Sequence, residues 1–368
     1  MNNKLFLRSI SISIIPLIMS CNNEHWNLNQ VAGIKGTDEG LTKMIVVNDS
    51  TGYLLGSLYN KDYALNKNLY TEQKAIIYKT SDNGNNWDNT LLGKGKFIDA
   101  CNLGDAVYAL KNIYHGNGVD SIEASQIYYT TGKGANWTLI SQIPDEVQHI
   151  YFANSKIGFL ITYYDHKLSK KVYMSDDGGK SWRQTSFKLV NTQLFYCSSK
   201  NVLWSLTGDD IGAMFYDILS QRKIKPELES KETLPNFRAV SFTGDSNNSL
   251  WFLGKENITK DILIVKRNSL GRYETIKRIR YEKGIAPKYI YVSKNIIDIL
   301  LSSGPSEYKE EGIFPIGVYK TKFIRSEDMG KTWHEENLPI DYRIEPFDFF
   351  GKETVWMYGG GQNLQVRR

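Results

Sequence analysis

The stretch Ser175-Asp176-Asp177-Gly178-Gly179-Lys180-Ser181-Trp182 recurs along the chain and decides its fold. It returns at 80–87, at 130–137 and at 326–333, and the shared pattern is Ser/Thr-x-Asp-x-Gly-x-x-Trp. The copy at 130–137 is degenerate, because Gly132 stands where the other copies have aspartate. Each copy follows a run of β-forming residues, so the pattern predicts a hairpin turn between two strands.

Each residue type in this turn motif has a physical reason to be there. Aspartate can accept hydrogen bonds from backbone N–H groups two or three residues further on. Glycine supplies the positive φ that reverses the chain. Tryptophan, at the start of the return strand, buries a large ring against a neighbouring layer. The structural residues of the motif are Asp82, Gly84, Trp87, Gly134, Trp137, Asp177, Gly179, Trp182, Asp328, Gly330 and Trp333.

A second, apolar run recurs seven times, centred at positions 53, 107, 159, 203, 251, 297 and 356. The intervals between these centres range from 44 to 59 residues, which is typical of the four-stranded blades of a β-propeller. Seven occurrences predict an all-β, seven-bladed propeller. We expect the apolar run to be the second strand from the axis and the turn motif to join the third and fourth strands.

The turn motif resembles the Asp-box, also called the bacterial neuraminidase repeat. Families that carry it are β-propellers, among them sialidases, sortilin-type receptors and propellers similar to photosystem II assembly factors. The resemblance implies one propeller over residues 21–368. The last apolar run is followed by enough chain for only one more strand, so we expect residues 26–30 to complete the last blade and close the ring.

The composition agrees with a β-rich soluble body and excludes several other classes. The 368 residues include 23 Tyr, 8 Trp and 30 Gly, but only 3 Cys, too few for a disulfide scaffold. A net charge of +5 is too small to indicate a nucleic-acid partner. Cys101 and Cys197 lie in apolar runs, and we expect buried free thiols there; pairing in an oxidising periplasm is the alternative.

The first twenty residues are typical of an export signal. Lys4 and Arg8 precede an apolar run at 10–19, which is too short to span a membrane. Ser20-Cys21 after this run resembles the bacterial lipoprotein box, which implies that Cys21 is lipidated and becomes the mature N terminus; an ordinary signal with a chance cysteine is the alternative. Removal of residues 1–20 lowers the net charge from +5 to +3. The expected location is the bacterial cell envelope, lipid-anchored and facing the periplasm, at the outer rather than the inner membrane.

The connections between second and third strands vary in length, and in a four-stranded meander they emerge on the face opposite the turn motifs. Variable loops on a rigid scaffold are the usual place for binding. The long connections cover 58–72, 111–125, 164–170 and 303–316, and the connection 225–236 belongs to the same face. The candidate partner-binding residues are Tyr63, Tyr70, Tyr114, His115, Tyr164, Tyr308 and Phe314.

Sialidase chemistry requires an arginine cluster to hold a carboxylate, together with a tyrosine nucleophile and its acidic partners. Residues 22–182 contain no arginine, so that active site is not expected here. The five histidines show no metal-ligand spacing, and the turn motifs lack the ligand series and final glutamate of calcium loops. The sequence therefore predicts no catalytic residues, no metal and no cofactor.

These observations favour a non-enzymatic, protein-binding propeller that is displayed as a lipoprotein and is a monomer when free. Two roles fit: an immunity protein that blocks a toxin delivered into the periplasm, or an assembly scaffold in the cell envelope. The alternative from another class is a glycan-binding propeller or a sialidase-like glycoside hydrolase.

Overall fold

The structure of the chain is a computed structural model. It describes residues 27–30, 37–48, 50–60, 73–115, 122–131, 134, 136–163, 169–190, 192–197, 202–207, 212–217, 222–224, 237–245, 247, 249–269, 272–280, 282–303, 307–311, 314–318, 321–337, 344–350, 354–359 and 363–367. Side chains are described within the ranges 40–58, 73–186, 237–303 and 321–336. Within these residues all regular structure is β, and no helix is long and apolar enough to cross a membrane.

Apart from one two-stranded hairpin, the described strands pair into antiparallel sheets of four, in most of which consecutive strands are neighbours. Five of these sheets carry described side chains. The strands of the first two are β2 (Thr37–Val46), β3 (Gly52–Asn60), β4 (Lys74–Thr80) and β5 (Asp88–Lys94), then β6 (Lys96–Leu103), β7 (Ala106–Tyr114), β8 (Ile122–Thr131) and β9 (Thr138–Ile143). The next is β10 (Val147–Phe152), β11 (Gly158–Thr162), β12 (Ser169–Ser175) and β13 (Arg183–Val190). The last two are β18 (Phe237–Gly244), β19 (Leu250–Glu256), β20 (Ile262–Arg267) and β21 (Tyr273–Ile279), then β22 (Ile285–Ser293), β23 (Ile296–Ser303), β26 (Thr321–Ser326) and β27 (His334–Asn337).

The remaining strands are described by their backbone pairing alone. They are β14 (Thr192–Cys197), β15 (Val202–Thr207), β16 (Gly212–Asp217) and β17 (Arg222–Ile224), and β28 (Ile344–Phe350), β29 (Thr354–Gly359), β30 (Asn363–Arg367) and β1 (Asn27–Gln30). Five blades are therefore described with their side chains, whereas the sequence predicted seven blades.

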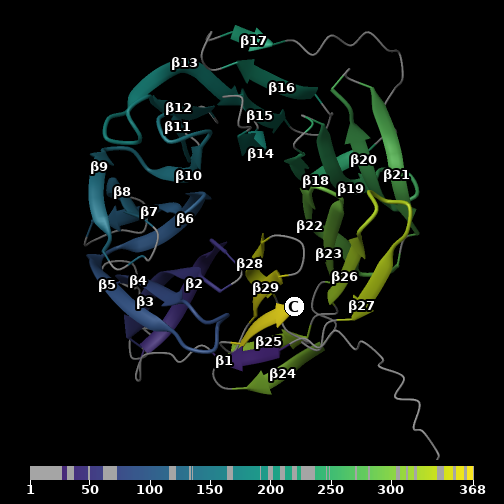
Figure 1. Ribbon diagram of the computed structural model, residues 1–368, viewed down its shortest axis with the longest axis horizontal. Helices are drawn as coiled ribbons and strands as arrows, with labels where there is room; N and C mark the ends of the chain where they lie inside the picture. Colours follow the sequence, from purple (N-terminus) through teal and green to yellow (C-terminus); the bar gives the residue numbers. More distant parts are fainter. Residues whose placement is uncertain are drawn as a thin grey trace, which may run out of the picture.

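The sheets are arranged as a β-propeller, with the first strand of each sheet nearest the central axis (Figure 1). First strands of neighbouring sheets contact one another in series, from β28 through β2, β6, β10, β14 and β18 to β22. The predicted apolar runs form second strands, as Tyr53 on β3 and Trp251 on β19 illustrate. The all-β propeller predicted from the repeats is thus confirmed.

The second strands whose side chains are described are covered on both of their faces. Leu54 and Leu55 on β3 point to opposite sides of their sheet, yet neither is exposed to solvent. Leu54 packs within its own sheet against Met44, whereas Leu55 packs toward Phe97 of the next sheet. Because both sides are buried, these strands are continuous apolar runs rather than alternating ones, which explains the repeat seen in the sequence.

The chain ends meet in one sheet. β1 pairs with β30 in the order β1-β30-β29-β28, with Asn27 opposite Val366 and Gln30 opposite Asn363. The strand expected at 26–30 therefore lies where it was predicted, although Trp26 itself is outside the described residues. This pairing covers an edge of the last sheet that would otherwise be open.

The connection predicted at 111–125 is mostly strand. Residues up to Tyr114 belong to β7 and those from Ile122 belong to β8, with Tyr114 opposite Ile122. A buried hydrogen bond of 2.8 Å from Ser125 Oγ to Asn112 Oδ1 holds the two strands together beyond the predicted strand ends. In the connection at 303–316 the chain forms a separate hairpin of β24 (Glu307–Glu311) and β25 (Phe314–Val318).

The turn motif around Asp177 is closed by side-chain hydrogen bonds. The Asp177 carboxylate accepts hydrogen bonds from the backbone N–H groups of Lys180 and Ser181, each 3.0 Å long. The Ser175 hydroxyl accepts a hydrogen bond of 2.8 Å from the backbone N–H of Gly179. The partners of the aspartate thus lie three and four residues further on, one more than predicted. The acceptors of the equivalent bonds in two other copies are Asp82 and Asp328.

The glycines and tryptophans of the motif behave as expected. The φ angles are 81° at Gly84, 56° at Gly134, 88° at Gly179 and 94° at Gly330. The half-buried indole rings of Trp87, Trp137, Trp182 and Trp333 pack against the hydrophobic cores of the sheets. Each ring comes immediately before the outermost strand of its sheet rather than at its first residue.

Substitution of Gly330 by alanine tests the packing of the motif. A Cβ atom at Gly330 would lie 2.4 Å from Ile276 Cγ2, in addition to the positive φ. Gly93 has a φ of 73° but no atom within 4 Å of such a Cβ. We expect Gly330→Ala to lower the free energy of unfolding by about 3 kcal/mol and Gly93→Ala by about 1 kcal/mol, measured by urea denaturation. Equal losses would contradict this packing.

Candidate functional site

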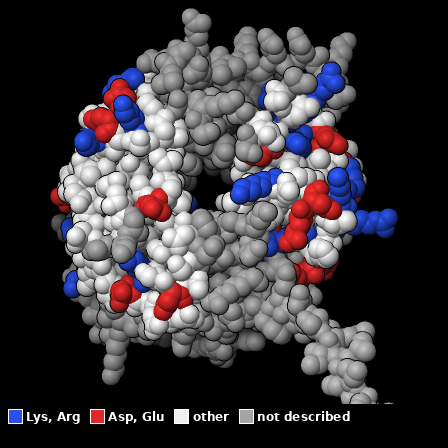
Figure 2. Space-filling model, viewed as in Figure 1, with Lys and Arg blue, Asp and Glu red and all other residues white. Residues whose placement is uncertain are grey.

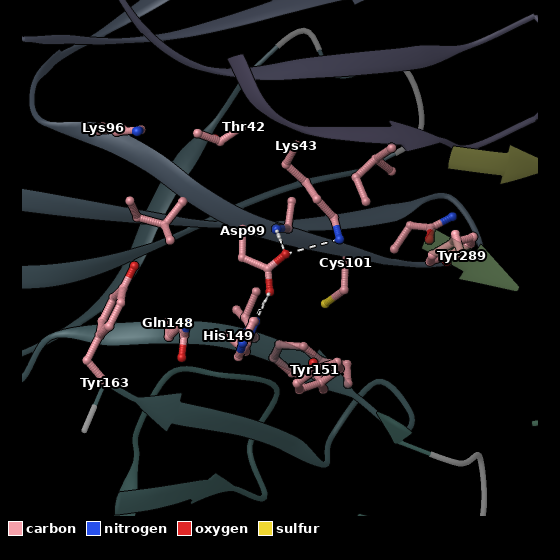
Figure 3. A pocket seen from close by; sticks show the side chains of 16 residues that line it. Thr42, Lys43, Lys96, Asp99, Cys101, Gln148, His149, Tyr151, Tyr163 and Tyr289 are labelled. Atoms are coloured by element: carbon pink, nitrogen blue, oxygen red, sulfur yellow. Dashed lines mark hydrogen bonds and ion pairs between the residues drawn. The ribbon is translucent and has the colours of Figure 1, made fainter. Parts of the chain in front are cut away.

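A cavity of about 730 Å³ opens between the first strands of three consecutive sheets, β2, β6 and β10 (Figure 3). Its polar and aromatic lining residues are Thr42, Lys43, Lys96, Asp99, Cys101, Asn102, Gln148, His149, Tyr151, Phe152, Tyr163 and Tyr289. Two lysines and one aspartate lie in this lining, so the cavity has a formal charge of +1 with a neutral histidine. We take it as the candidate functional site because it is hollow, polar and built from a rigid part of the fold.

A repeated irregularity in the first strands positions the charged side chains. The register with the second strand shifts by one residue in each of the three strands, at Thr42, Ile98 and Gln148. A β-bulge of this kind re-aims the side chains that follow it. The residues directly after the three bulges are Lys43, Asp99 and His149. Equivalent positions in consecutive repeats therefore converge on one point.

Asp99 is the centre of this group. One oxygen of its carboxylate lies 3.1 Å from Lys43 Nζ, and the other lies 3.4 Å from His149 Nδ1. The backbone N–H groups of Ala100 and Ile150 donate to the same carboxylate at 2.9 and 3.2 Å. The contacts join three sheets, because Lys43 belongs to β2 and both His149 and Ile150 belong to β10 (Figure 3).

These contacts keep Asp99 ionised. Burial alone raises the pKa of Asp99, but the charge of Lys43 and the hydrogen bond with His149 outweigh it and lower the pKa to about 2. An ionised carboxylate accepts about four hydrogen bonds, and the four donors around Asp99 use that capacity. A carboxylate with this pKa and no spare acceptor site is suited to joining sheets rather than to donating a proton.

Substitution of Asp99 by asparagine tests this role. The lowered pKa means that Asp99 contributes stability above the pKa of the unfolded chain, and that this stability is lost as pH falls toward about 2. We expect Asp99→Asn to lower the free energy of unfolding by about 2 kcal/mol at pH 7, with a smaller difference from wild type near pH 2. Urea denaturation at a series of pH values measures this difference.

The exposed Asp105, in the turn between β6 and β7, provides the matched control. We expect Asp105→Asn to leave the stability nearly unchanged at each pH. A loss for Asp99→Asn that does not depend on pH would show that shape, not charge, is what Asp99 supplies.

The predicted partner-binding residues are only partly described. Tyr114 lies half-buried at the end of β7, and His115 follows it and is exposed. Tyr308 and Phe314 lie on β24 and β25, where only the backbone is described. Tyr63, Tyr70, Tyr164 and the predicted lipidation site Cys21 lie outside the described residues. The described part of the chain therefore does not bring these residues together.

Cys101 differs in part from its prediction. The thiol is not in a disulfide, as expected, but it is half-buried rather than buried and lines the cavity. The side chain of Cys197 is outside the described residues.

Ile258 is an exposed apolar residue that sequence reasoning missed. It lies in the connection between β19 and β20, the second and third strands of their sheet, and 79% of its surface is exposed. The turn is short, so it gave no signal as a long insertion. The available signal was an isoleucine within the otherwise polar run Lys255-Glu256-Asn257-Ile258-Thr259-Lys260-Asp261.

The turn that carries Ile258 is held in shape. The backbone N–H of Glu256 donates to Asp261 O at 2.8 Å, and that of Lys260 donates to Glu256 O at 3.0 Å. Arg278 on β21 bridges the two acidic side chains, at 2.6 Å from Glu256 and 3.1 Å from Asp261. These contacts fix both ends of the turn, so the isoleucine is presented on a rigid support.

On the face that Figure 2 draws, the basic and acidic side chains of the described residues are interspersed around the central hollow. This mixing agrees with the small net charge of the chain.

No family model and no curated protein matches this sequence. Among solved structures, the chain is similar to YCF48 from Cyanidioschyzon merolae, at 13% identity and a TM-score of 0.56, over 93% of this chain and 98% of the other. It is also similar to the β-propeller domain of the Trilobed protease from Pyrococcus furiosus, at 12% identity and a TM-score of 0.53, over 91% and 93% of the two chains. Likeness at these identities shows the fold alone.

The second of these relatives is described as having an open velcro topology. In the present chain β1 completes the last sheet by pairing with β30.

Proposed function

We propose that this chain is a protein-binding propeller whose partner surface is the face that carries the connections between second and third strands. The observation that carries the proposal is Ile258, which is 79% exposed on that face. An exposed apolar side chain among polar neighbours, on a turn whose ends are hydrogen-bonded, is a favourable anchor for a protein partner.

The contacts around the turn support this role. Arg278 compensates one of the two negative charges of Glu256 and Asp261, which lowers the electrostatic cost of burying the neighbouring isoleucine. The hairpin of β24 and β25 lies in the equivalent connection of the next sheet, between β23 and β26. Two adjacent sheets therefore contribute to the same face.

The chemistry of the cavity supports binding over catalysis. Among its described lining residues Asp99 is the one carboxylate, whereas glycoside hydrolysis usually takes a pair. That carboxylate is already bonded to four donors. These residues therefore favour a non-enzymatic role without a cofactor over the glycan-cleaving alternative.

We also propose that the ring has seven blades and is lipid-anchored in the bacterial envelope. The backbone pairing of β14–β17 and of β28–β30 with β1 would supply two blades beyond the five whose side chains are described. Five residues separate Cys21 from Asn27, the first residue of β1. At about 3.5 Å per residue, such a tether would hold the propeller within roughly 20 Å of the membrane surface.

Two roles require a partner surface of this kind. One is inhibition of a toxin delivered to the periplasm, and the other is assembly of a complex in the cell envelope. The identity of the captured partner decides between them.

Affinity capture with the anchored, full-length protein tests the partner surface. We expect Ile258→Asp to weaken binding of the captured partner at least tenfold, since a charge would have to be buried in the interface. Leu91→Asp is the matched control, because Leu91 is 47% exposed on the outer strand β5, away from that face. Equal binding by the two variants, with unchanged folding by circular dichroism, would refute the proposed surface.

Shortening of the hairpin is a second test of the same face. Ser302 on β23 pairs with Thr321 on β26, so a two-residue Asn-Gly turn can replace residues 303–320. We expect the shortened protein to keep its thermal unfolding midpoint within a few degrees and to lose affinity for the partner. Full retention of affinity would remove the hairpin from the partner surface.

Substitution of Cys21 by serine tests the anchor. We expect the wild-type protein in the membrane fraction and Cys21→Ser in the soluble periplasmic fraction, because acyl chains on Cys21 would supply the membrane affinity. Fractionation followed by immunoblotting measures this distribution. An unchanged membrane fraction would contradict lipidation at Cys21.

A further inference from the structure

One end of the cavity holds hydrogen-bond donors without matching acceptors. The structure gives the half-buried ammonium of Lys96 no ion-pair or hydrogen-bond partner in the described part of the chain. The hydroxyl of Tyr163, which also lines the cavity, has none there either. Figure 3 shows both side chains on the same side of the cavity, with the Tyr163 hydroxyl directed toward the part where Lys96 lies.

Gln148 adds a donor further along the lining, on the side of Tyr163 that is away from Lys96 (Figure 3). Its side-chain oxygen accepts a hydrogen bond of 2.5 Å from the ammonium group of the buried Lys170. That bond fixes the orientation of the amide, so the NH₂ group is turned away from Lys170 and is available to an acceptor in the cavity. Gln148 occupies the bulge of β10, which is why its side chain lies in the lining.

Lys96 gives this end of the cavity a positive charge, while burial and then the charges of Glu146 and Asp99 raise the pKa of the Tyr163 hydroxyl. Lys43 and Asp99 neutralise one another at 3.1 Å, which leaves Lys96 as the uncompensated charge of the lining. Burial lowers the pKa of Lys96, which means that its charged form is poorly solvated. A bound anion would replace the missing solvation and stabilise the charged form.

This end of the cavity opens on the proposed partner face. Lys96 begins β6, directly after the connection from the preceding sheet, and Tyr163 follows the last residue of β11. Starts of first strands and ends of second strands lie at the same edge, as the pairing of Val147 with Thr162 shows. Ile258 lies in a connection at that edge as well, so a partner on this face would meet Lys96 and Tyr163 at the mouth of the cavity.

We propose that this end of the cavity binds a carboxylate, with the Lys96 ammonium as counter-ion and the Tyr163 hydroxyl as a donor. The carboxylate can come from an acidic side chain of the protein partner, in which case the inference rests on the proposed function. It can also come from a free small dicarboxylate. The chemistry at the site is the same, and the probes below distinguish the two sources.

Saturation-transfer difference NMR on the full chain tests the site. The probes are succinate, acetyl-Gly-Glu-Gly-amide and the isosteric acetyl-Gly-Gln-Gly-amide, each titrated to about 10 mM, well above a Kd near 1 mM. We expect both carboxylates to bind at least tenfold more tightly than the glutamine peptide at constant ionic strength. Tighter binding of the glutamate peptide than of succinate indicates a protein source, and the reverse order indicates a free acid.

Variants locate the binding. Lys96→Gln is expected to abolish the preference for the carboxylates, and Tyr163→Phe, which removes only the hydroxyl, to weaken carboxylate binding about threefold. The exposed Lys94 on β5 gives the matched control, and Lys94→Gln should bind as the wild type does. Equal binding of glutamate and glutamine peptides, or full carboxylate binding by Lys96→Gln, would overturn the proposal.

The capture experiment separates this inference from the proposed function. A partner that Ile258→Asp loses but Lys96→Gln keeps at full affinity would leave the partner surface in place and refute the protein source of the carboxylate. Carboxylate binding that depends on Lys96, without any partner lost by Ile258→Asp, would keep the site and refute the proposed surface.

Discussion

Burial of the second strands on both faces is the constraint on which the rest of the structure depends. Leu54 and Leu55 point to opposite sides of one sheet and neither is exposed, so a single sheet of this sequence could not be stable in water. The next sheet must cover it, as Phe97 does for Leu55. Repetition of this packing turns the sheets about an axis and places the first strands around it. The tryptophans of the turn motif extend the same apolar contacts toward the outer strands.

The first strands then define the polar interior. Their bulges place Lys43, Asp99 and His149 at equivalent positions in three neighbouring sheets, where they join across the cavity. A buried carboxylate is stable there only because Lys43 and three N–H donors compensate it. Lys96 has no such compensation among the described residues. The same feature that fixes the fold therefore leaves one end of the cavity suited to a carboxylate.

The sequence predicted the repeated features well and the local ones poorly. The apolar runs and the closing strand β1 could be found because each repeats, or completes, a pattern set by backbone pairing. The group around Asp99 could not, since its members are 50 or more residues apart and only an unforeseen bulge in each strand aligns them. Tyr114 was assigned to a loop because residues 111–125 were predicted to be a long connection between second and third strands, yet the buried pair of Asn112 and Ser125 extends the strands. Ile258 was missed because its turn is short, although rigidity, not length, makes it a candidate anchor.

Site-specific photo-crosslinking in living cells tests the central claim, that the partner binds at the face carrying Ile258, most directly. A benzophenone amino acid at position 258 would lie on the proposed surface, and the same residue at the exposed Lys180 would lie at the opposite end, in a turn motif. The account predicts a covalent adduct to one protein from position 258 and none from position 180. An adduct from position 180 alone would contradict it and place the partner on the turn-motif face.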